Sequence, residues 1–477
     1  MPDHCLRRLL LGAPLLLLAG PAAALTLYEA VAHAYASNPT IAAQRALVRQ
    51  VDEGVPIALS QARPTLSPSV SFRQDLSDGF NDDGRLVSAG AVLGQPIFLG
   101  GRVRAGVEGG EQRIESARAR LVAVENSVMV AAVAAYADVL RARSIVRLNE
   151  NQVRVLSEQL RASRDRFEVG DLTRTDVAQS EARLEAARAS LIAARTREVQ
   201  AEQAFQRITG LAPANLQPLP PLPPLPSDAE SAREAALALN PDLKAARFDE
   251  TAARADVKSI AGERWGSVRL QVSGQYQDFS GGSGTIGFGG LSGFNASIGV
   301  TASMPLLTGG LIAARTRQAQ ARQSQLLEAI SQTERLVDEE VAQRFAQLRN
   351  AEATIVSAEA AVSANRLAVE GVRQENLVGS RNIIDVLNAE QELLNAEIVR
   401  ENAERDRYVA AYALLETTGD LSALLAGASV ERYDPAANAR RVRRGWGEFA
   451  TDPDPRESRE RNRAPLTPAA RAPGERP

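Results

Sequence analysis

The chain carries one pattern of turn signals twice, at a constant separation of 209 residues. A glycine stands six residues ahead of an aspartate in RFEVGDLTRTDV, which begins at Arg166, and again in ENLVGSRNIIDV, which begins at Glu375. Gly-Gly pairs recur at the same separation, beginning at Gly100 and Gly309. Two copies of so long a period predict a duplicated supersecondary unit rather than a solenoid of many short repeats.

Two structural repeats follow from this spacing, residues 25–217 and residues 227–425. Asn-Pro pairs begin at Asn38 and Asn240, only 202 residues apart, so the second copy has gained residues, and it contains the glycine-rich stretch SGGSGTIGFGG. The segment PLPPLPPLP, residues 218–226, predicts a stiff, extended linker between the repeats.

The first 24 residues have the pattern of a signal peptide. Arg7 and Arg8 precede the short apolar stretch Leu9–Leu18, which small residues follow. This stretch is too short to span a bilayer, although a retained N-terminal anchor is the alternative. The single cysteine, Cys5, would be removed with the peptide, so the exported chain would carry neither a disulfide nor a lipidation cysteine.

Each repeat predicts a helical hairpin of unusual length. Residues 102–167 and 311–376 contain no proline, and at about 1.5 Å per residue each helix would span roughly 100 Å. Gly170 and Gly379 are interpreted as helix-ending glycines at the hairpin tips. Small and apolar residues recur every seven positions, as in coiled coils: Ile114, Leu121, Val128, Ala135 and Ala142, then Val341, Leu348, Ile355, Val362 and Val369.

Four strands are predicted before these hairpins, near 67–77, 85–98, 267–279 and 293–305. Apolar and polar residues alternate in strands of about ten residues, which fits a membrane β-barrel. A soluble hairpin with one buried face is the alternative. Four strands cannot close a barrel, so several chains would have to share one.

An enzyme is a poor fit to this composition. One histidine, His33, remains after the signal peptide, and we expect it to pack or to lie on the surface. Without a cysteine, thiolate chemistry and Cys/His zinc sites are excluded. The glycine-rich stretch lacks the Lys-Ser/Thr ending of a phosphate loop. We expect no catalytic residue, metal site or cofactor, and the net charge of −3 argues against nucleic acid as a partner.

Several segments resemble the TolC-like outer-membrane efflux proteins. They are Asn38-Pro39 after LTLYEAVAHAYAS, QPIFLGGRVRA, RFEVGDLTRTDV and NIIDVLNAEQELLNAE, in this order and with the duplication. The resemblance covers about residues 25 to 426. It implies an α+β fold and a homotrimer, in which four strands per chain share one transmembrane β-barrel in the outer membrane. The barrel would continue into a long α-helical coiled-coil tunnel across the periplasm.

The resemblance also implies roles for residues behind the two turns. Asp385 matches an aspartate that points inward and forms a ring at the periplasmic entrance, where three carboxylates would attract cations. Arg381 matches an arginine that links neighbouring hairpins, and Asp176 matches an acidic partner of such links. The family's second aspartate and a common tyrosine are here Asn388 and Asn376, so we expect a closed state held less tightly or by different contacts. The alternative for both aspartates is a helix-start carboxylate that complements the helix dipole.

The tips themselves, Val169-Gly170 and Val378-Gly379, would dock the periplasmic adaptor. The implied partners are that adaptor, an inner-membrane transporter of the ABC or RND type, and outer-membrane lipid. The chain would be an export duct and not an enzyme. A periplasmic coiled-coil adaptor is the rival class, but it would not need four alternating strands.

Two uses of such a duct compete. Type I protein secretion is favoured by the missing lipidation cysteine and by the tail of residues 426–477, whose first part resembles the end of secretion components. Multidrug or small-molecule efflux is the alternative. From about residue 451 the tail is rich in Pro, Arg and Glu, and we expect it to be disordered.

Overall fold

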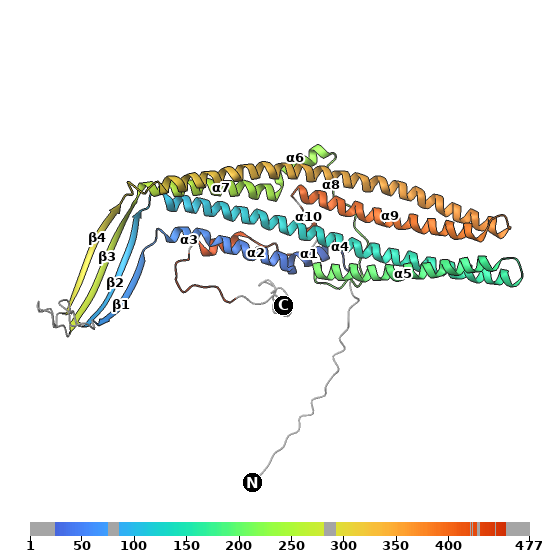
Figure 1. Cartoon of the computed structure of the whole chain (residues 1–477), viewed down its shortest axis with the longest axis horizontal. Coiled ribbons are helices and arrows are strands. Elements are labelled where there is room, and N and C mark those ends of the chain that lie inside the picture. Colours follow the sequence, from blue (N-terminus) through green and yellow to red (C-terminus); the bar gives the residue numbers. More distant parts are fainter. Residues whose placement is uncertain are drawn as a thin grey trace, which may run out of the picture.

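The computed structural model describes residues 24–74, 85–280, 292–419, 421, 423–426, 430–443 and 445–454. The molecule is elongated, with a four-stranded sheet at one end and two helical hairpin tips at the other (Figure 1). The predicted signal peptide lies outside the described residues except for Ala24. Residues 281–291, which include all of the glycine-rich stretch after Ser280, and the tail beyond residue 454 also lie outside them.

The two repeats contain corresponding elements in the same order, with α2 and α3 of the first repeat in the place of α7 and η1 of the second. The first contains α1 (Leu27–Ser37), α2 (Pro39–Asp52), α3 (Gly54–Ser60), β1 (Thr65–Gln74), β2 (Arg85–Phe98), α4 (Arg102–Glu168) and α5 (Arg174–Thr209). The second contains α6 (Ala229–Leu239), α7 (Pro241–Ala261), the 3-10 turn η1 (Gly262–Trp265), β3 (Ser267–Ser280), β4 (Ser292–Ser303), α8 (Leu311–Leu377) and α9 (Ile383–Thr417). The short helices α10 (Ala423–Ala426) and α11 (Ala436–Val442) follow. Both long helices, α4 and α8, have 67 residues.

β2 has the predicted bounds, and the other strand ends that can be compared differ from the predicted ranges by at most two residues. β1 begins at Thr65 instead of residue 67, and the predicted end at residue 77 lies outside the described part of the chain. β4 runs from Ser292 to Ser303 and stops before Pro305, which cannot donate to a ladder. Before the strands, α7 is continuous where the first repeat breaks into α2 and α3, and this break lies in the segment where the separation changes from 202 to 209.

The sheet is antiparallel throughout, in the order β1-β2-β3-β4. Leu66 pairs with Leu93, Leu93 pairs with Val272, and Val272 pairs with Ile298, so one apolar row crosses all four strands. A second row runs through Val70, Ala89, Tyr276 and Phe294. Directly opposite residues in an antiparallel pair share a face, so the centre of this face is apolar.

The other face of the sheet is mostly polar. Ser71 and Ser88 share a hydrogen bond of 2.7 Å across β1 and β2, and Ser273 and Ser297 share one of 2.7 Å across β3 and β4. Gln271, next to Val272, lies on this face. The predicted alternation is therefore present in the pairing register of the whole sheet.

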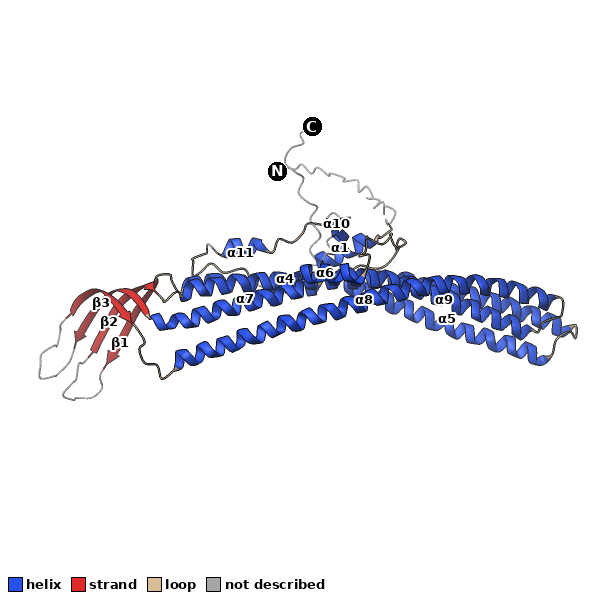
Figure 2. Cartoon of the chain, turned by 90° about the horizontal axis from the view of Figure 1, so that it is seen from above, coloured by secondary structure: helices blue, strands red, loops and turns tan. Residues whose placement is uncertain are grey.

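Heptad positions hold the long helices together. All ten of the seven-residue positions predicted in α4 and α8 are buried, which confirms the coiled-coil pattern. Helix α4 packs along α5, and α8 packs along α9 (Figures 1 and 2). Each return helix starts after a glycine turn and runs back to the middle of the molecule. Gly100, at the other end of α4, has no room for a side chain, since a Cβ would lie 2.2 Å from the Gly262 carbonyl oxygen.

The Asn-Pro pairs join helices at the middle of the molecule. Asn38 caps α2 with its side-chain oxygen, and its Nδ2 donates to the Ile208 carbonyl near the end of α5 at 2.9 Å. Asn240 repeats this arrangement: it caps α7, and its Nδ2 donates to the Thr417 carbonyl at the end of α9 at 3.2 Å. Each pair therefore ties the start of one helix to the end of another in the same repeat.

The proline-rich linker packs as a ribbon across both hairpins. Its leucines stand at every third position, Leu219, Leu222 and Leu225, and the three-residue period of polyproline II places them on one side. Leu219 and Leu222 contact the core cluster around Tyr136, and Leu222 and Leu225 contact the cluster around Leu414. The linker thus bridges the two repeats through apolar contacts.

One stretch of α4 is apolar and long enough to cross a membrane, but more than half of it is buried inside the chain. Val133, Tyr136 and Val139 of α4 are fully buried in the central cluster, where they contact residues of α1, α5 and α9. Packing between helices accounts for this apolar composition. Among the described helices no other passes the same test.

Candidate functional site at the hairpin tips

Both long helices end in the same glycine turn. Gly170 has a φ of 83° and Gly379 a φ of 79°, in the left-handed region that favours glycine. In each turn the glycine N–H donates to the carbonyl three residues back, and the next N–H donates to the carbonyl five residues back, at 2.9–3.1 Å. This is the Schellman motif of helix ends. The repeated Val-Gly pattern is thus the sequence of two equivalent helix terminators.

One ion pair spans each turn. In the first turn the arginine precedes the glycine and the acidic residue follows it, and in the second turn this order is reversed. Arg166 Nε donates to Asp171 Oδ2 at 2.7 Å, whereas in the second turn Arg381 Nε donates to Glu375 Oε2 at 2.9 Å. The Arg381 guanidinium also lies 3.8 Å from the carboxylate of Asp385. These side chains are one-third to more than half exposed, so each pair contributes about 1 kcal/mol at most. Within one chain Arg381 therefore contacts its own hairpin.

Asn376 joins the two tips to each other. Its side chain is buried, and its Oδ1 accepts a hydrogen bond from Arg166 of the first hairpin at 3.4 Å. Its Nδ2 donates to the Arg381 carbonyl across the second turn at 2.9 Å. The resemblance implied only that Asn376 replaces a tyrosine common in the family. In the structure the asparagine supplies a different set of contacts at the same place.

The two aspartates behind the turns differ in their surroundings, although both are the third residue of a helix. Asp176 belongs to a capping box at the start of α5, where its carboxylate accepts from the Thr173 N–H at 3.0 Å and from the Thr173 hydroxyl at 2.7 Å. Asp385 follows Asn382, which caps α9 without a capping box. The carboxylate of Asp176 is thus engaged in its own helix start, the alternative given above, and that of Asp385 is half-exposed with Arg381 near it.

Asn388 lies one turn after Asp385 and contacts the first hairpin. Its Oδ1 accepts a hydrogen bond of 2.8 Å from Arg183 of α5. Residues three apart in a helix lie on one side, so Asp385 and Asn388 share a stripe of α9. The stripe therefore carries a carboxylate at its start and an arginine-bound amide one turn later.

A small apolar cluster holds the tips beneath these polar contacts. It contains Leu156 and Leu160 of α4, Leu184 and Ala187 of α5, and Ile383, Val386 and Leu387 of α9. At the ends of the turns, Val169 and Val378 are 80% and 81% exposed. The tips therefore present two equivalent exposed valines next to a packed apolar cluster.

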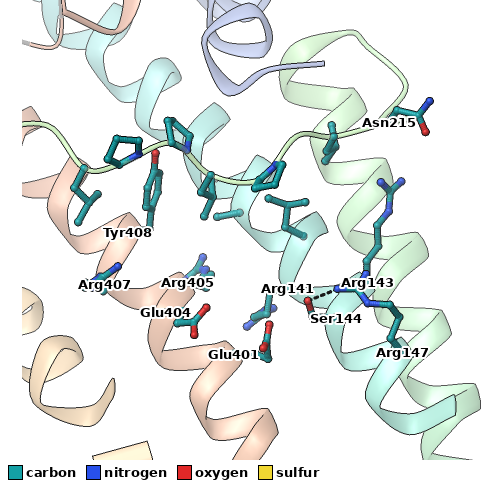
Figure 3. A pocket seen from close by; sticks show the side chains of 18 of the residues that line it. Arg141, Arg143, Ser144, Arg147, Asn215, Glu401, Glu404, Arg405, Arg407 and Tyr408 are labelled. Carbon is teal, nitrogen blue, oxygen red and sulfur yellow. Dashed lines mark hydrogen bonds between the residues drawn. The ribbon is translucent and has the colours of Figure 1, made fainter. Parts of the chain in front are cut away.

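A cavity of about 700 Å³ beneath the linker is a second candidate (Figure 3). Arginines from α4 and α9 line it, but several have partners: Arg143 donates to Glu202 at 2.7 Å, and Arg405 donates to Asp138 at 3.0 Å. Burial, and secondly the Glu401 carboxylate, raise the pKa of Glu404 above its usual value. The cavity is a polar seam between the linker and the hairpins, and paired charges form part of its lining.

His33 has a packing role. Its Nδ1 lies 2.5 Å from the Thr209 carbonyl at the end of α5 and donates to it. The side chain thus joins α1 to the return helix, as expected of a packing histidine.

Asn376→Ala should loosen the tips. The change removes the bridge between Arg166 and the Arg381 carbonyl, and a lost buried hydrogen bond costs about 1–1.5 kcal/mol. Amide exchange in both turns should become faster, by about tenfold. Hydrogen exchange measured by mass spectrometry on peptides covering residues 163–175 and 372–384 checks this. Phe167→Ala is the matched control, since Phe167 is the exposed equivalent of Asn376 in the first copy. Equal exchange in the two variants would contradict the bridging role.

Comparison with known families gives one match over both repeats. The family model described as "Outer membrane efflux protein" matches residues 30–211 and again residues 232–420. The double match confirms the tandem duplication.

Individual relatives cover most of the chain. The outer membrane efflux protein BepC of Brucella suis is 34% identical over 421 residues, which are 88% of this chain and 91% of that protein. The alkaline protease secretion protein AprF of Pseudomonas aeruginosa is 29% identical over 299 residues, 60% of each chain. The solved structure of the CmeC outer membrane channel of Campylobacter jejuni has a TM-score of 0.72 at 16% identity, over 88% of this chain and 89% of that one, which shows a shared fold.

Proposed function

The chain belongs to the outer membrane efflux protein family, and we propose that three copies of it form the passive exit duct of an export system. It has the fold of trimeric outer-membrane channels, lies in the outer membrane and extends into the periplasm. The family is one of channels rather than of enzymes. In the proposed trimer the sheets close one barrel, and the hairpins enclose a tunnel through which substrate leaves the cell.

The four-stranded sheet carries this proposal. One face is apolar in its centre and exposed: Ile298 and Phe294 are 74% and 72% exposed. The opposite face is mostly polar, as in the wall of a water-filled barrel. Among the described strands β1 and β4 pair on one side only, and a membrane tolerates no open sheet edge. Copies of the same chain would pair these edges and remove them.

The assembly is tested by mass. The purified chain in detergent should be a trimer, because the barrel is incomplete in one copy. Native mass spectrometry or light scattering corrected for detergent measures this. A stable, folded monomer would exclude the shared barrel.

Type I protein secretion is the use we propose for the duct. The relative AprF is named for the secretion of alkaline protease, and a second relative, PrtF of Dickeya chrysanthemi, for the secretion of proteases. Small-molecule efflux is the second candidate, which the name of the 34% identical relative BepC favours. The transporter class distinguishes them, ABC for protein secretion and RND for most drug efflux.

The partners are proposed to dock at Val169 and Val378. The turns hold these side chains exposed at the ends of rigid hairpins, which suits contact with a periplasmic adaptor and the transporter behind it. Cysteine placed at either position should crosslink to the adaptor in cells, and the captured complex identifies the transporter. The single native cysteine, Cys5, lies in the predicted signal peptide, so each variant would present one thiol.

Val356→Cys is the control for this experiment. Val356 is an apolar residue of α8 with 69% exposure, well before the tip. Crosslinking at Val169 and Val378 but not at Val356 supports docking at the tips. An ABC transporter in the complex supports protein secretion, and an RND transporter would favour efflux. Capture from Val356 alone would contradict the tip assignment.

A further inference from the structure

After the second repeat the chain turns back and contacts α1, α2 and α4 of the first repeat. We call the described part of this returning segment, residues 430–443 and 445–454, the C-terminal strap. Arg45 of α2 lies between two rings, 4.6 Å from the Tyr35 centroid and 4.8 Å from the Tyr433 centroid. Asn438 donates to the buried carboxylate of Asp52 at 2.9 Å. These contacts fix the strap on α2 with specific geometry.

The strap reaches the foot of the sheet at Gly445. Arg443 pairs with Glu111, in the third turn of α4, at 2.8 Å. Arg63 donates to the Gly445 carbonyl at 3.0 Å, and Arg63 stands two residues before β1 begins at Thr65. Figure 2 shows α11 lying over the half of the helices nearest the sheet. The strap around Gly445 is therefore held at the level where β1 starts.

Two aromatic residues at this end have little protein around them. Trp446 is 68% exposed and Phe449 is 99% exposed. Trp446 precedes a turn in which Ala450 N donates to the Gly447 carbonyl at 3.1 Å, and Phe449 lies within this turn. Arg441 donates to both carboxylate oxygens of Asp452 at 2.7 and 2.9 Å and so fixes the base of this turn.

Other exposed apolar residues stand close in sequence to the foot of the sheet. Trp265 precedes β3, Leu306 and Leu307 follow β4, and Ile57 lies in α3; their exposed fractions are 68%, 83%, 97% and 64%. Tryptophan concentrates at membrane–water interfaces, and aromatic girdles flank the apolar band of outer-membrane barrels. Exposed apolar side chains are therefore present between the strands and the helices.

We propose that Trp446 and Phe449 insert into the periplasmic leaflet of the outer membrane and make the strap a second anchor beside the barrel. The partner is the phospholipid interface, because Trp446 directly follows Gly445, which Arg63 holds two residues before the start of β1. Arg441 and Arg443 are paired with acidic residues, so the contact does not require anionic lipid. The strap would then tie the first repeat, through α2 and α4, to the membrane surface. The inference rests on the proposed placement of the sheet in the bilayer.

The two tryptophans of the chain allow a direct test. Trp265→Phe leaves Trp446 as the sole reporter, and Trp446→Phe leaves Trp265 as the reference at the foot of β3. Both variants are reconstituted in phosphatidylcholine vesicles with and without bromine near the carbonyl end of the acyl chains. Trp446 should be quenched to a similar extent as Trp265. In the single-reporter background Phe449→Ser should reduce the quenching of Trp446, while Leu239→Ser, an exposed change in α6, should not.

Three results would overturn the anchor. Quenching of Trp265 but not of Trp446 would place the strap in water and leave the duct intact. Loss of quenching at both positions would remove the sheet from the bilayer and contradict the proposed function as well. Protection of Trp446 from aqueous acrylamide in detergent-solubilised trimers, without lipid quenching in vesicles, would assign the pair to contact with a neighbouring copy.

Discussion

Val272→Arg is expected to abolish assembly of the trimer in the outer membrane, whereas Gln271→Arg should assemble almost as the parent does. The two residues are neighbours in β3 but lie on opposite faces of the sheet. Val272 belongs to the apolar row that also contains Leu93 and Ile298. Gln271 lies on the polar face, opposite Gly94 and Gly299, where a long side chain has room.

The magnitude follows from the lipid around the barrel. An arginine on the lipid face near the midplane costs about 2–4 kcal/mol, and the cost falls toward zero near the interfaces. A shared barrel carries the change three times, so the penalty approaches the whole stability of an ordinary domain. On the polar face the same charge stays in water and costs little.

Heat-modifiable migration in outer-membrane fractions measures assembly, with and without boiling. Ile298→Arg and Ser297→Arg repeat the comparison in β4 and guard against a local fault in one strand. Loss of the trimer in both lipid-face variants and its retention in both polar-face variants support this register. Equal behaviour of each pair would reject it.

Sequence reasoning reached the hairpins and the strands because duplication supplied an internal check. The turn at Gly170 occurs again at Gly379, and α4 and α8 each contain their own heptads, so each copy supports the prediction made for the other. The pairing of β2 with β3 joins the two repeats and carries no local signal. It follows from closing four strands into one sheet with a common apolar face.

Contacts that depend on unequal residues in the two copies could not be predicted. Asp176 and Asp385 occupy the same position, yet Thr173 draws Asp176 into a capping box while Asn382 leaves Asp385 outside one. The resemblance indicated only that Asn376 replaces a tyrosine. Its hydrogen bond with Arg166 is seen only in the structure. The contacts of the strap could not be predicted either, since its partners lie several hundred residues upstream. No periodic pattern links Tyr433 to Tyr35.

Asp385→Ala is expected to weaken the cation selectivity of the duct and its block by multivalent cations. In the proposed trimer Asp385 would contribute three carboxylates at the periplasmic entrance, where a ring of like charges attracts cations. The half-exposed side chain in the first turn of α9 suits this role. Asp176→Ala is the matched change in the first copy. Because Asp176 holds a capping box, its loss should destabilise the start of α5 and leave selectivity nearly unchanged.

Asn388→Asp tests the same ring in the opposite direction. By the resemblance, Asn388 would stand where the family has its second aspartate, and in the structure Arg183 donates to it at 2.8 Å. A carboxylate at this position would pair with Arg183 and neutralise part of its charge. Cation block should therefore increase, but by less than a free second ring would give. Arg183→Ala in the same background should release the full effect.

Arg381→Ala separates the contacts that hold the second tip from the proposed ring of Asp385 carboxylates. Arg381 closes its own turn through Glu375 and lies near Asp385, so its removal should loosen the second tip and raise conductance, while the carboxylates remain. Single-channel recordings in planar bilayers distinguish the two roles. Selectivity and block should follow Asp385, and conductance should follow Arg381. If Asp385→Ala and Arg381→Ala both matched the parent in all three properties, the entrance would lie elsewhere. Asp385 would then be a helix-start carboxylate that complements the dipole of α9.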